Sequence, residues 1–159
     1  MTYTAAVITV SDSTNMGQRT DTSGPAICSM LEEAGYSGIH TAIVPNDIPA
    51  IRAMLTACAD EKQLELIIAT GSTGLSPRDV TPEATLGILE REIRAIPVAM
   101  WMEGLKHTPR AMLSRAVAGT RGHSLILNLP DSEKTARENL SAVIATLEHA
   151  LRMMTAEGH

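Results

Sequence analysis

Aromatic residues are almost missing from this chain. It contains no phenylalanine, and aromatic residues make up 2% of its 159 residues. Proteins that hold single-stranded nucleic acids usually stack the bases on aromatic side chains. The net charge is −5 and no basic tract is present, which also argues against a nucleic-acid partner. With 44% apolar residues, the core must be filled by leucine, isoleucine, valine, alanine and methionine.

Cysteine is scarce, and long apolar runs are absent. The two cysteines, Cys28 and Cys58, have apolar neighbours in predicted helices, which favours buried free thiols over a disulfide scaffold. No apolar run approaches the roughly 18 residues of a membrane span. The first ten residues lack the basic start of a signal peptide. We therefore expect a cytoplasmic protein without a membrane partner.

Strand-like and helix-like segments alternate along the chain, and its length predicts a single domain, 1–159. Strands are predicted at 4–10, 39–44, 64–69, 116–118 and 124–129; helices are predicted at about 23–34, from 47 onward, at 82–91, 98–105 and 133–154. Such alternation with short connections is typical of an α/β fold. The pattern predicts a three-layer αβα domain with a mostly parallel, mixed sheet.

Ligands of such folds bind beyond the carboxyl ends of the strands. Four polar loops are expected at that edge, at 11–13, 46–47, 71–79 and 130–132. The topology predicts that these loops converge on one site.

The segment 64–85 combines a buried strand, a loop with two glycines and a helix start. Free N–H groups in such a loop bind phosphate, although a plain strand-to-helix turn is the alternative. The segment matches neither a P-loop nor G-x-G-x-x-G. Arg78 and Asp79 favour the phosphate site, because phosphoryl transfer needs a cation for phosphate and a carboxylate for Mg²⁺. Thr81 is the predicted cap of the helix, with Pro82 in its first position.

The sequence of this segment resembles that of a known family. Thr70-Gly71-Ser72-Thr73-Gly74 and Arg78-Asp79-x-Thr81-Pro82-Glu83-Ala84 resemble the signature T-G-G-T-G-x-x-x-R-D-x-T-P-E-A of the MogA/MoaB molybdopterin-binding proteins. The resemblance runs nearly end to end, through 10–13, Asp21-x-Ser23-Gly24, 43–45, 113–119 and 127–130.

The resemblance implies a MogA-like fold that assembles as a trimer, or as a dimer of trimers. It also implies molybdopterin as the ligand, with ATP and Mg²⁺ for the active members, which are adenylyltransferases. In their reaction the molybdopterin phosphate attacks the α-phosphate of Mg·ATP, pyrophosphate leaves and adenylyl-molybdopterin forms.

The same resemblance implies the site residues. Asp79 and Asp47 are the expected catalytic and metal-binding carboxylates. The expected substrate-binding residues are Ser11, Asp12, Ser13, Asp21, Ser23, Gly24, Thr70, Gly71, Ser72, Thr73, Gly74, Arg78, Ser114, Arg115, Pro130 and Ser132. Three alternatives stay open: helix capping for Asp79 and for Asp47, and a surface ion pair for Arg115.

Three positions depart from the family pattern. Asn46 stands where the family has an aspartate, Ser72 replaces a glycine, and Asp131 follows Pro130 in place of a glycine. A side chain at position 72 is strained if its φ is positive. These departures support a second hypothesis, a non-catalytic molybdopterin-binding protein, which predicts that Asn46→Asp gains activity. A third hypothesis is a nucleotide-phosphate hydrolase, as in competence-damage-type proteins that contain this fold.

Overall fold

The structure is a computed structural model, and it describes residues 2–155. In chain order its elements are β1 (Thr4–Val10), α1 (Asp12–Asn15), α2 (Ser23–Glu33), β2 (Ser37–Val44), α3 (Ile48–Thr56), the π-helix η1 (Ala57–Glu61), β3 (Leu66–Thr70), α4 (Thr81–Leu86), β4 (Arg91–Glu92), α5 (Ala95–Leu105), the 3-10 helix η2 (Pro109–Leu113), β5 (Ala118–Arg121), β6 (Ser124–Leu129) and α6 (Glu133–Met154).

The described strands form one mixed sheet in the order β2-β1-β3-β6-β5-β4. The pairs β1–β2, β1–β3 and β3–β6 are parallel, whereas β5 runs antiparallel to both of its neighbours. All residues of β3 and β6 are buried, as expected for strands that helices cover on both faces. The predicted mostly parallel, mixed sheet is confirmed.

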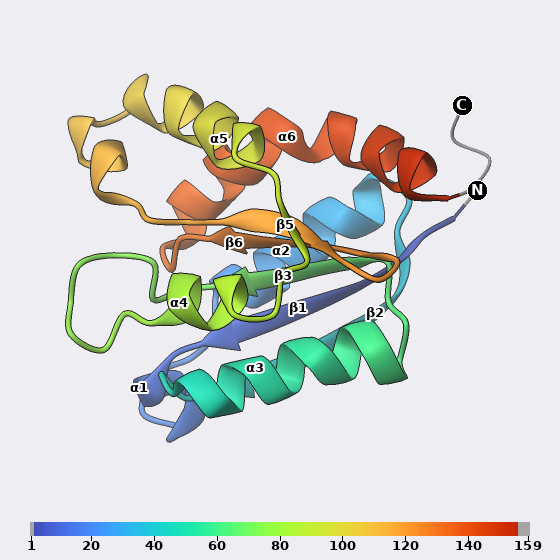
Figure 1. The fold of residues 1–159 in the computed structure, drawn as a ribbon. Coiled ribbons are helices and arrows are strands. Elements are labelled where there is room, and N and C mark those ends of the chain that lie inside the picture. Colours follow the sequence, from blue (N-terminus) through green and yellow to red (C-terminus); the bar gives the residue numbers. More distant parts are fainter. Residues whose placement is uncertain (1, 156–159) are drawn as a thin grey trace.

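Side chains of the central strands alternate between two cores. In β1, Ala5 and Val7 pack with residues of α2, α5 and α6, while Ala6 and Ile8 pack with residues of α3 and α4. Figure 1 shows α5 and α6 on one side of the sheet and α3 and α4 on the other. The period of two along each strand therefore builds the three predicted layers.

The carboxyl ends of β1 and β3 point to the left in Figure 1, where α1 and the loop between β3 and α4 also lie. The four predicted polar loops meet at this edge. A hydrogen bond joins the loops after β1 and β2, another joins those after β2 and β3, and a cavity lined by Asp131 joins the loop after β6. The predicted convergence is thus confirmed.

Helix α4 ends at Leu86, so the predicted extension to Arg91 is wrong, and Arg91 belongs to the unpredicted strand β4. The guanidinium of Arg52 explains the early end, because it donates hydrogen bonds of 3.2 Å to the carbonyls of Glu83 and Ala84. Carbonyls at a helix end need such partners. The start was predicted one residue late, since Val80 occupies the cap position.

Other boundaries also differ from the prediction. Helix α5 begins at Ala95 and holds Pro97 in its first turn, where a missing N–H costs no helical hydrogen bond. Strand β5 begins at Ala118, two residues after the predicted start. A short helix, α1, lies in the segment predicted as a loop, and the side chain of Ser11 caps it.

Both thiols are free in the structure. Cys58 is buried as predicted, whereas Cys28 is only partly buried, because it faces a groove beside β2. Burial raises the pKa of both thiols above the ordinary value. Within residues 2–155, no helix has the length and apolar character needed to cross a membrane.

Candidate functional site

The loop between β3 and α4 begins with two residues of left-handed backbone conformation. Gly71 has a φ of 104°, and a Cβ there would lie 2.5 Å from the carbonyl oxygen of Val10. Ser72 has a φ of 57°, so the strain expected for a side chain at this position is present. This conformation costs a non-glycine residue about 1–2 kcal/mol. Hydrogen bonds of the Ser72 hydroxyl offset part of that cost.

The loop presents N–H groups and turns its carbonyls away. The amides of Ser72, Thr73 and Gly74 find no acceptor among residues 2–155. The carbonyls of Thr73 and Gly74, by contrast, accept from the backbone N–H and the Nε of Arg115 at 2.9 and 2.8 Å. Successive free amides in a tight turn form a concave anion site. The local backbone therefore has the polarity that a phosphate group requires.

Arg115 holds this loop together. Besides the carbonyl of Gly74, its guanidinium donates to the carbonyl of Asp79 at 2.8 Å and pairs with Glu83. Partial burial acts to raise the pKa of Glu83, but the hydrogen bond from Arg115, a backbone hydrogen bond and the charge of Arg115 together outweigh it and hold that pKa below the ordinary value. The surface ion pair that was the alternative for Arg115 is therefore present, with Glu83 as the partner, but it is only one of the contacts of Arg115. Arg115 also binds the backbone of the loop, through the carbonyls of Gly74 and Asp79.

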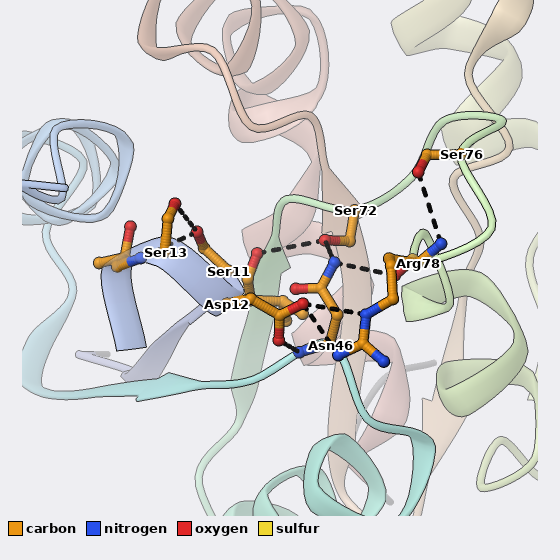
Figure 2. Close-up of polar contacts among 9 residues, drawn as sticks. Ser11, Asp12, Ser13, Asn46, Ser72, Ser76 and Arg78 are labelled. Carbon is orange, nitrogen blue, oxygen red and sulfur yellow. Dashed lines mark hydrogen bonds and ion pairs between the residues drawn. The ribbon is translucent and has the colours of Figure 1, made fainter. Parts of the chain in front are cut away.

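Asn46 joins three loops at the centre of the site (Figure 2). Its backbone N–H donates to Asp12 Oδ1 at 2.9 Å. Its side-chain Nδ2 donates to Ser72 Oγ at 2.7 Å and to the carbonyl of Arg78 at 2.8 Å. The Arg78 guanidinium closes the ring with bonds of 3.0 and 2.8 Å to Asp12 Oδ2.

The carboxylate of Asp12 is the anionic centre of this ring. The hydrogen bond from the Asn46 N–H outweighs burial and, together with the Arg78 guanidinium, holds the pKa of Asp12 below its ordinary value. The Arg78 side chain is 64% exposed, so its charge remains open to solvent and ligands. Asp12 and Arg78 are thus brought together as a pair.

The two predicted carboxylates occupy different surroundings. Asp79 accepts from the N–H of Ser76 at 3.0 Å through Oδ2, and its Oδ1 accepts no hydrogen bond from residues 2–155. Asp47 caps α3, because its Oδ2 accepts from the N–H of Ala50 at 2.9 Å. The capping alternative for Asp47 is confirmed, and Asp47 lines neither cavity described below. Asn46, not Asp47, lies in the site with Asp79.

Two adjacent cavities, of about 310 and 390 Å³, open at this edge of the sheet. Ser72, Asp79 and Asp131 line both, so the loop stands between them. Of the predicted substrate-binding residues, the first cavity is lined by Ser11, Asp12, Ser13, Asp21, Ser23, Thr70, Gly71 and Ser72, and the second by Ser72, Thr73, Gly74, Ser114 and Pro130. Gly24, Arg78, Arg115 and Ser132 line neither cavity.

Some of these residues act through their neighbours. Asp21 accepts from the Thr9 hydroxyl at 2.7 Å and from the N–H of Gly24 at 3.0 Å, which fixes the start of α2 beside Ser23. A Cβ at Gly24 would lie 2.3 Å from Asp21 Oδ2. Ser132 caps α6 through the N–H of Thr135. Gly24 and Ser132 therefore shape the site from outside the cavities.

Two cations of the site were missed from the sequence. Arg19 lines the first cavity and Arg110 lines the second. Neither was part of a motif recognised in the sequence, so only the folded chain places them. Asn46 and Asp131 were noted as departures from a pattern, but their place in the cavities came from the structure.

No cluster of three or more histidine, cysteine, aspartate or glutamate side chains in residues 2–155 is placed to hold a metal ion. Mg²⁺ makes modest demands on a protein, since one or two carboxylates often suffice beside substrate phosphates and water. Asp79 offers a free carboxylate oxygen. Asn46 Oδ1 is buried without a hydrogen-bond partner, so it offers a second oxygen ligand for a metal ion. These two residues fit a Mg²⁺ ion that enters with a phosphate ligand.

Comparison with known proteins finds relatives in molybdenum cofactor biosynthesis. The cinnamon protein of Drosophila melanogaster, a molybdenum cofactor synthesis protein, is 38% identical over 95% of this chain, which spans 25% of its length. A molybdopterin adenylyltransferase of Helicobacter pylori J99 is 37% identical, over 93% of this chain and 85% of its own length. The crystal structure of the molybdopterin biosynthesis enzyme MoaB from Thermus thermophilus superposes with a TM-score of 0.90.

That MoaB structure shares 43% of its residues with this chain and covers 99% of it, while 98% of the MoaB chain is matched. The family model described as "Probable molybdopterin binding domain" matches residues 6–149. The match includes β1 from Ala6 onward, the strands β2, β3 and β6, the loops that follow these four strands, and the residues that line both cavities. The chain therefore belongs to the molybdopterin-binding domain family of molybdenum cofactor biosynthesis proteins.

Proposed function

We propose that the chain is a molybdopterin adenylyltransferase, which transfers AMP from Mg·ATP to the terminal phosphate of molybdopterin. The observation that carries this proposal is the pair of cavities that meet at one anion-binding loop. A reaction between two phosphate-bearing substrates needs two adjacent pockets and a shared point of contact. The loop with the free amides of Ser72, Thr73 and Gly74 supplies that point, and Asp79 faces both pockets.

The reaction brings two anions together, so positioning and positive charge decide its rate. A phosphate oxygen of molybdopterin forms a bond to the α-phosphorus of ATP, and the bond from that phosphorus to the bridging oxygen of pyrophosphate breaks. The loop amides hold phosphate oxygens by their N–H groups. Arg19 and Arg110, one in each cavity, offset the charge of the two substrates.

Magnesium bound with ATP would supply further positive charge to the phosphates. Asp79 and Asn46 Oδ1 are the residues that would hold it. Asp79 has a second function in the loop, because its Oδ2 keeps the N–H of Ser76 in place. ATP is made and used in the cytoplasm, so we expect the protein to act there.

The test is the formation of adenylyl-molybdopterin from molybdopterin and labelled Mg·ATP. We expect Asp79→Asn to lower kcat at least about 100-fold, since a metal-positioning carboxylate acts mainly on the transition state. The isosteric control is Asp60→Asn, because Asp60 pairs with Arg121 away from both cavities. No product from the wild-type protein, with molybdopterin still bound, would contradict the proposal.

The same assay decides between the other two hypotheses. A non-catalytic molybdopterin-binding protein would bind the pterin and make no product; the observation that favours it is the amide at position 46, which leaves Asp79 as the carboxylate of the loop. A nucleotide-phosphate hydrolase would release phosphate from ATP when no pterin is present.

We also propose that the chain assembles as a homotrimer. Helix α5 presents an apolar stripe outward, with Val98, Met102 and Leu105 exposed by 44, 65 and 47%. Met112 and Leu113 of the adjoining η2 extend this stripe. Exposed apolar side chains that gather in one patch mark interaction surfaces. The resemblance to the MogA/MoaB proteins favours further copies of the same chain as the partner.

A further inference from the structure

Two of the residues that depart from the family pattern contact each other. Asn46 follows β2 and Ser72 follows β3, and Nδ2 of the amide donates to the hydroxyl oxygen at 2.7 Å (Figure 2). The hydroxyl lies 3.3 Å from the carbonyl of Val10, to which it donates. The second N–H of the amide reaches the carbonyl of Arg78 at 2.8 Å. Ser72 and Arg78 stand near the two ends of the anion-binding loop.

The direction of each hydrogen bond determines which type of side chain fits at position 46. The carbonyls of Val10 and Arg78 can only accept, so the Ser72 hydroxyl is free to accept from Asn46 while it donates to Val10. Both groups that face the Asn46 side chain therefore require a donor. An amide offers two N–H groups on one nitrogen, whereas an ionised carboxylate offers none.

Two side chains, those of Arg115 and Asn46, hold the loop by these contacts. Arg115 takes the carbonyls of Gly74 and Asp79, and Asn46 takes the carbonyl of Arg78 and the hydroxyl of Ser72. With its carbonyls occupied, the loop leaves its amides free for an anion. All of these contacts are made by protein groups alone.

We propose that Asn46 and Ser72 form one positioning unit that keeps the anion-binding loop in its binding shape without a metal ion. What the loop binds rests on the proposed function; how the loop is held does not. An aspartate at position 46 would set a carboxylate oxygen against the Arg78 carbonyl and would take the Ser72 hydroxyl from Val10. Asn46→Asp therefore weakens the site in this chain, contrary to the gain of activity that the sequence hypothesis of a non-catalytic protein predicts.

The experiment measures hydrogen exchange of three hydrogen-bonded loop amides, those of Ser76, Asp79 and Thr81, in the wild-type protein and in Asn46→Ala, Asn46→Asp and Ser72→Ala. Loss of two ordinary hydrogen bonds corresponds to roughly tenfold faster exchange, so we expect about tenfold for both Asn46 variants. We also expect about tenfold for Ser72→Ala, because its hydroxyl makes two of these hydrogen bonds. Exchange in β3 and β6 should stay at the wild-type level, because these strands do not depend on the contact.

The double variant Asn46→Ala/Ser72→Ala tests whether the two residues act as one unit. A single unit that shares the Asn46–Ser72 hydrogen bond loses three bonds in all and predicts about thirtyfold faster exchange, whereas multiplied effects of about a hundredfold would show independent residues and overturn the proposal. Asn15→Asp is the charge control, since it adds one negative charge on an exposed side chain near the site.

Binding of inorganic pyrophosphate without metal separates positioning from general stability. We expect its affinity to fall at least about fivefold in both Asn46 variants, while Tm changes by only a few degrees. Added Mg²⁺ should not restore exchange protection in Asn46→Asp. Wild-type exchange or tighter pyrophosphate binding in Asn46→Asp would contradict the proposal.

Two outcomes separate this inference from the proposed function. If Asn46→Asp does not fold, Asn46→Ala, Ser72→Ala and their double variant decide the inference by exchange alone. If the wild-type protein makes no adenylyl-molybdopterin but the exchange results hold, the proposed function fails and the positioning unit stands. If transfer is observed and loop exchange is unchanged in the variants, only the positioning unit fails.

Discussion

Single side chains in this site act mainly by holding backbone. Arg115 and Asn46 donate hydrogen bonds to carbonyls of the loop. Asp21 accepts hydrogen bonds from the Thr9 hydroxyl and from the N–H of Gly24. The sequence could predict that Asp79 and the loop glycines matter, because their residue types match the chemistry. It could not predict the function of Asn46, since both acceptors of its side chain lie in the loop after β3, 26 and 32 residues further along the chain.

The pair of Asp12 and Arg78 predicts a pH dependence at the residue scale. The pKa of Asp12 is lower in the folded protein, so its charged form adds stability above its unfolded pKa, and this stability is lost as pH falls through the folded pKa. Asp12→Asn keeps an acceptor for the Asn46 N–H but removes the ion pair. We expect a lower Tm for Asp12→Asn between pH 5 and 8.

That difference in Tm should begin to shrink below about pH 4, the ordinary pKa of an aspartate, and should be lost once pH falls through the lower pKa of Asp12 in the folded protein. Thermal unfolding of both proteins across this range is the measurement. Because both side chains are partly exposed, the effect is small, and raised salt should reduce it. A constant difference down to the lowest pH would show that Asp12 does not act through its charge.

At the scale of elements, the strands were easier to predict than the ends of the helices. The runs that form β1, β3 and β6 are mostly apolar, and a strand buried on both faces requires such a run. The end of α4 depends instead on Arg52, which comes from another helix and packs beside Gly87. A local helical pattern carries no sign of such a contact, so the prediction extended the helix into β4.

The anion-binding loop shows the same division. Its glycines and its place after a buried strand were visible in the sequence, whereas the strain at Ser72 was predicted only for a positive φ, which the structure supplies. The orientation of its carbonyls was not visible, because Arg115 reaches it from a segment more than 30 residues further along the chain, beyond α5. Local composition thus predicts the position of the loop, and tertiary contacts determine which of its polar groups stay free.

At the scale of the whole molecule, the apolar stripe on α5 and η2 predicts self-association. A charge in its centre should break the trimer, because a buried unpaired charge costs several kcal/mol. We expect Met102→Glu to run as a monomer in light scattering coupled to size-exclusion chromatography. Met153→Glu is the matched control, since Met153 is 55% exposed on α6. A Met102→Glu protein that remains trimeric would place the interface on another face.

The parallel sheet turns separate segments of sequence into one site. The loops after β1, β2, β3 and β6 come from all parts of the chain, yet hydrogen bonds and shared cavities join them at one edge. This gathering was predictable from the alternation of strands and helices. The division of the site into two cavities, with the loop between them, required the folded structure.

A crystal structure of the protein with molybdopterin and a non-hydrolysable ATP analogue would test the central claim most directly. The account predicts one ligand in each cavity, with phosphate oxygens within hydrogen-bond distance of the amides of Thr73 and Gly74 and with Asp79 facing both ligands. Phosphates bound elsewhere, with these amides turned to solvent, would contradict it.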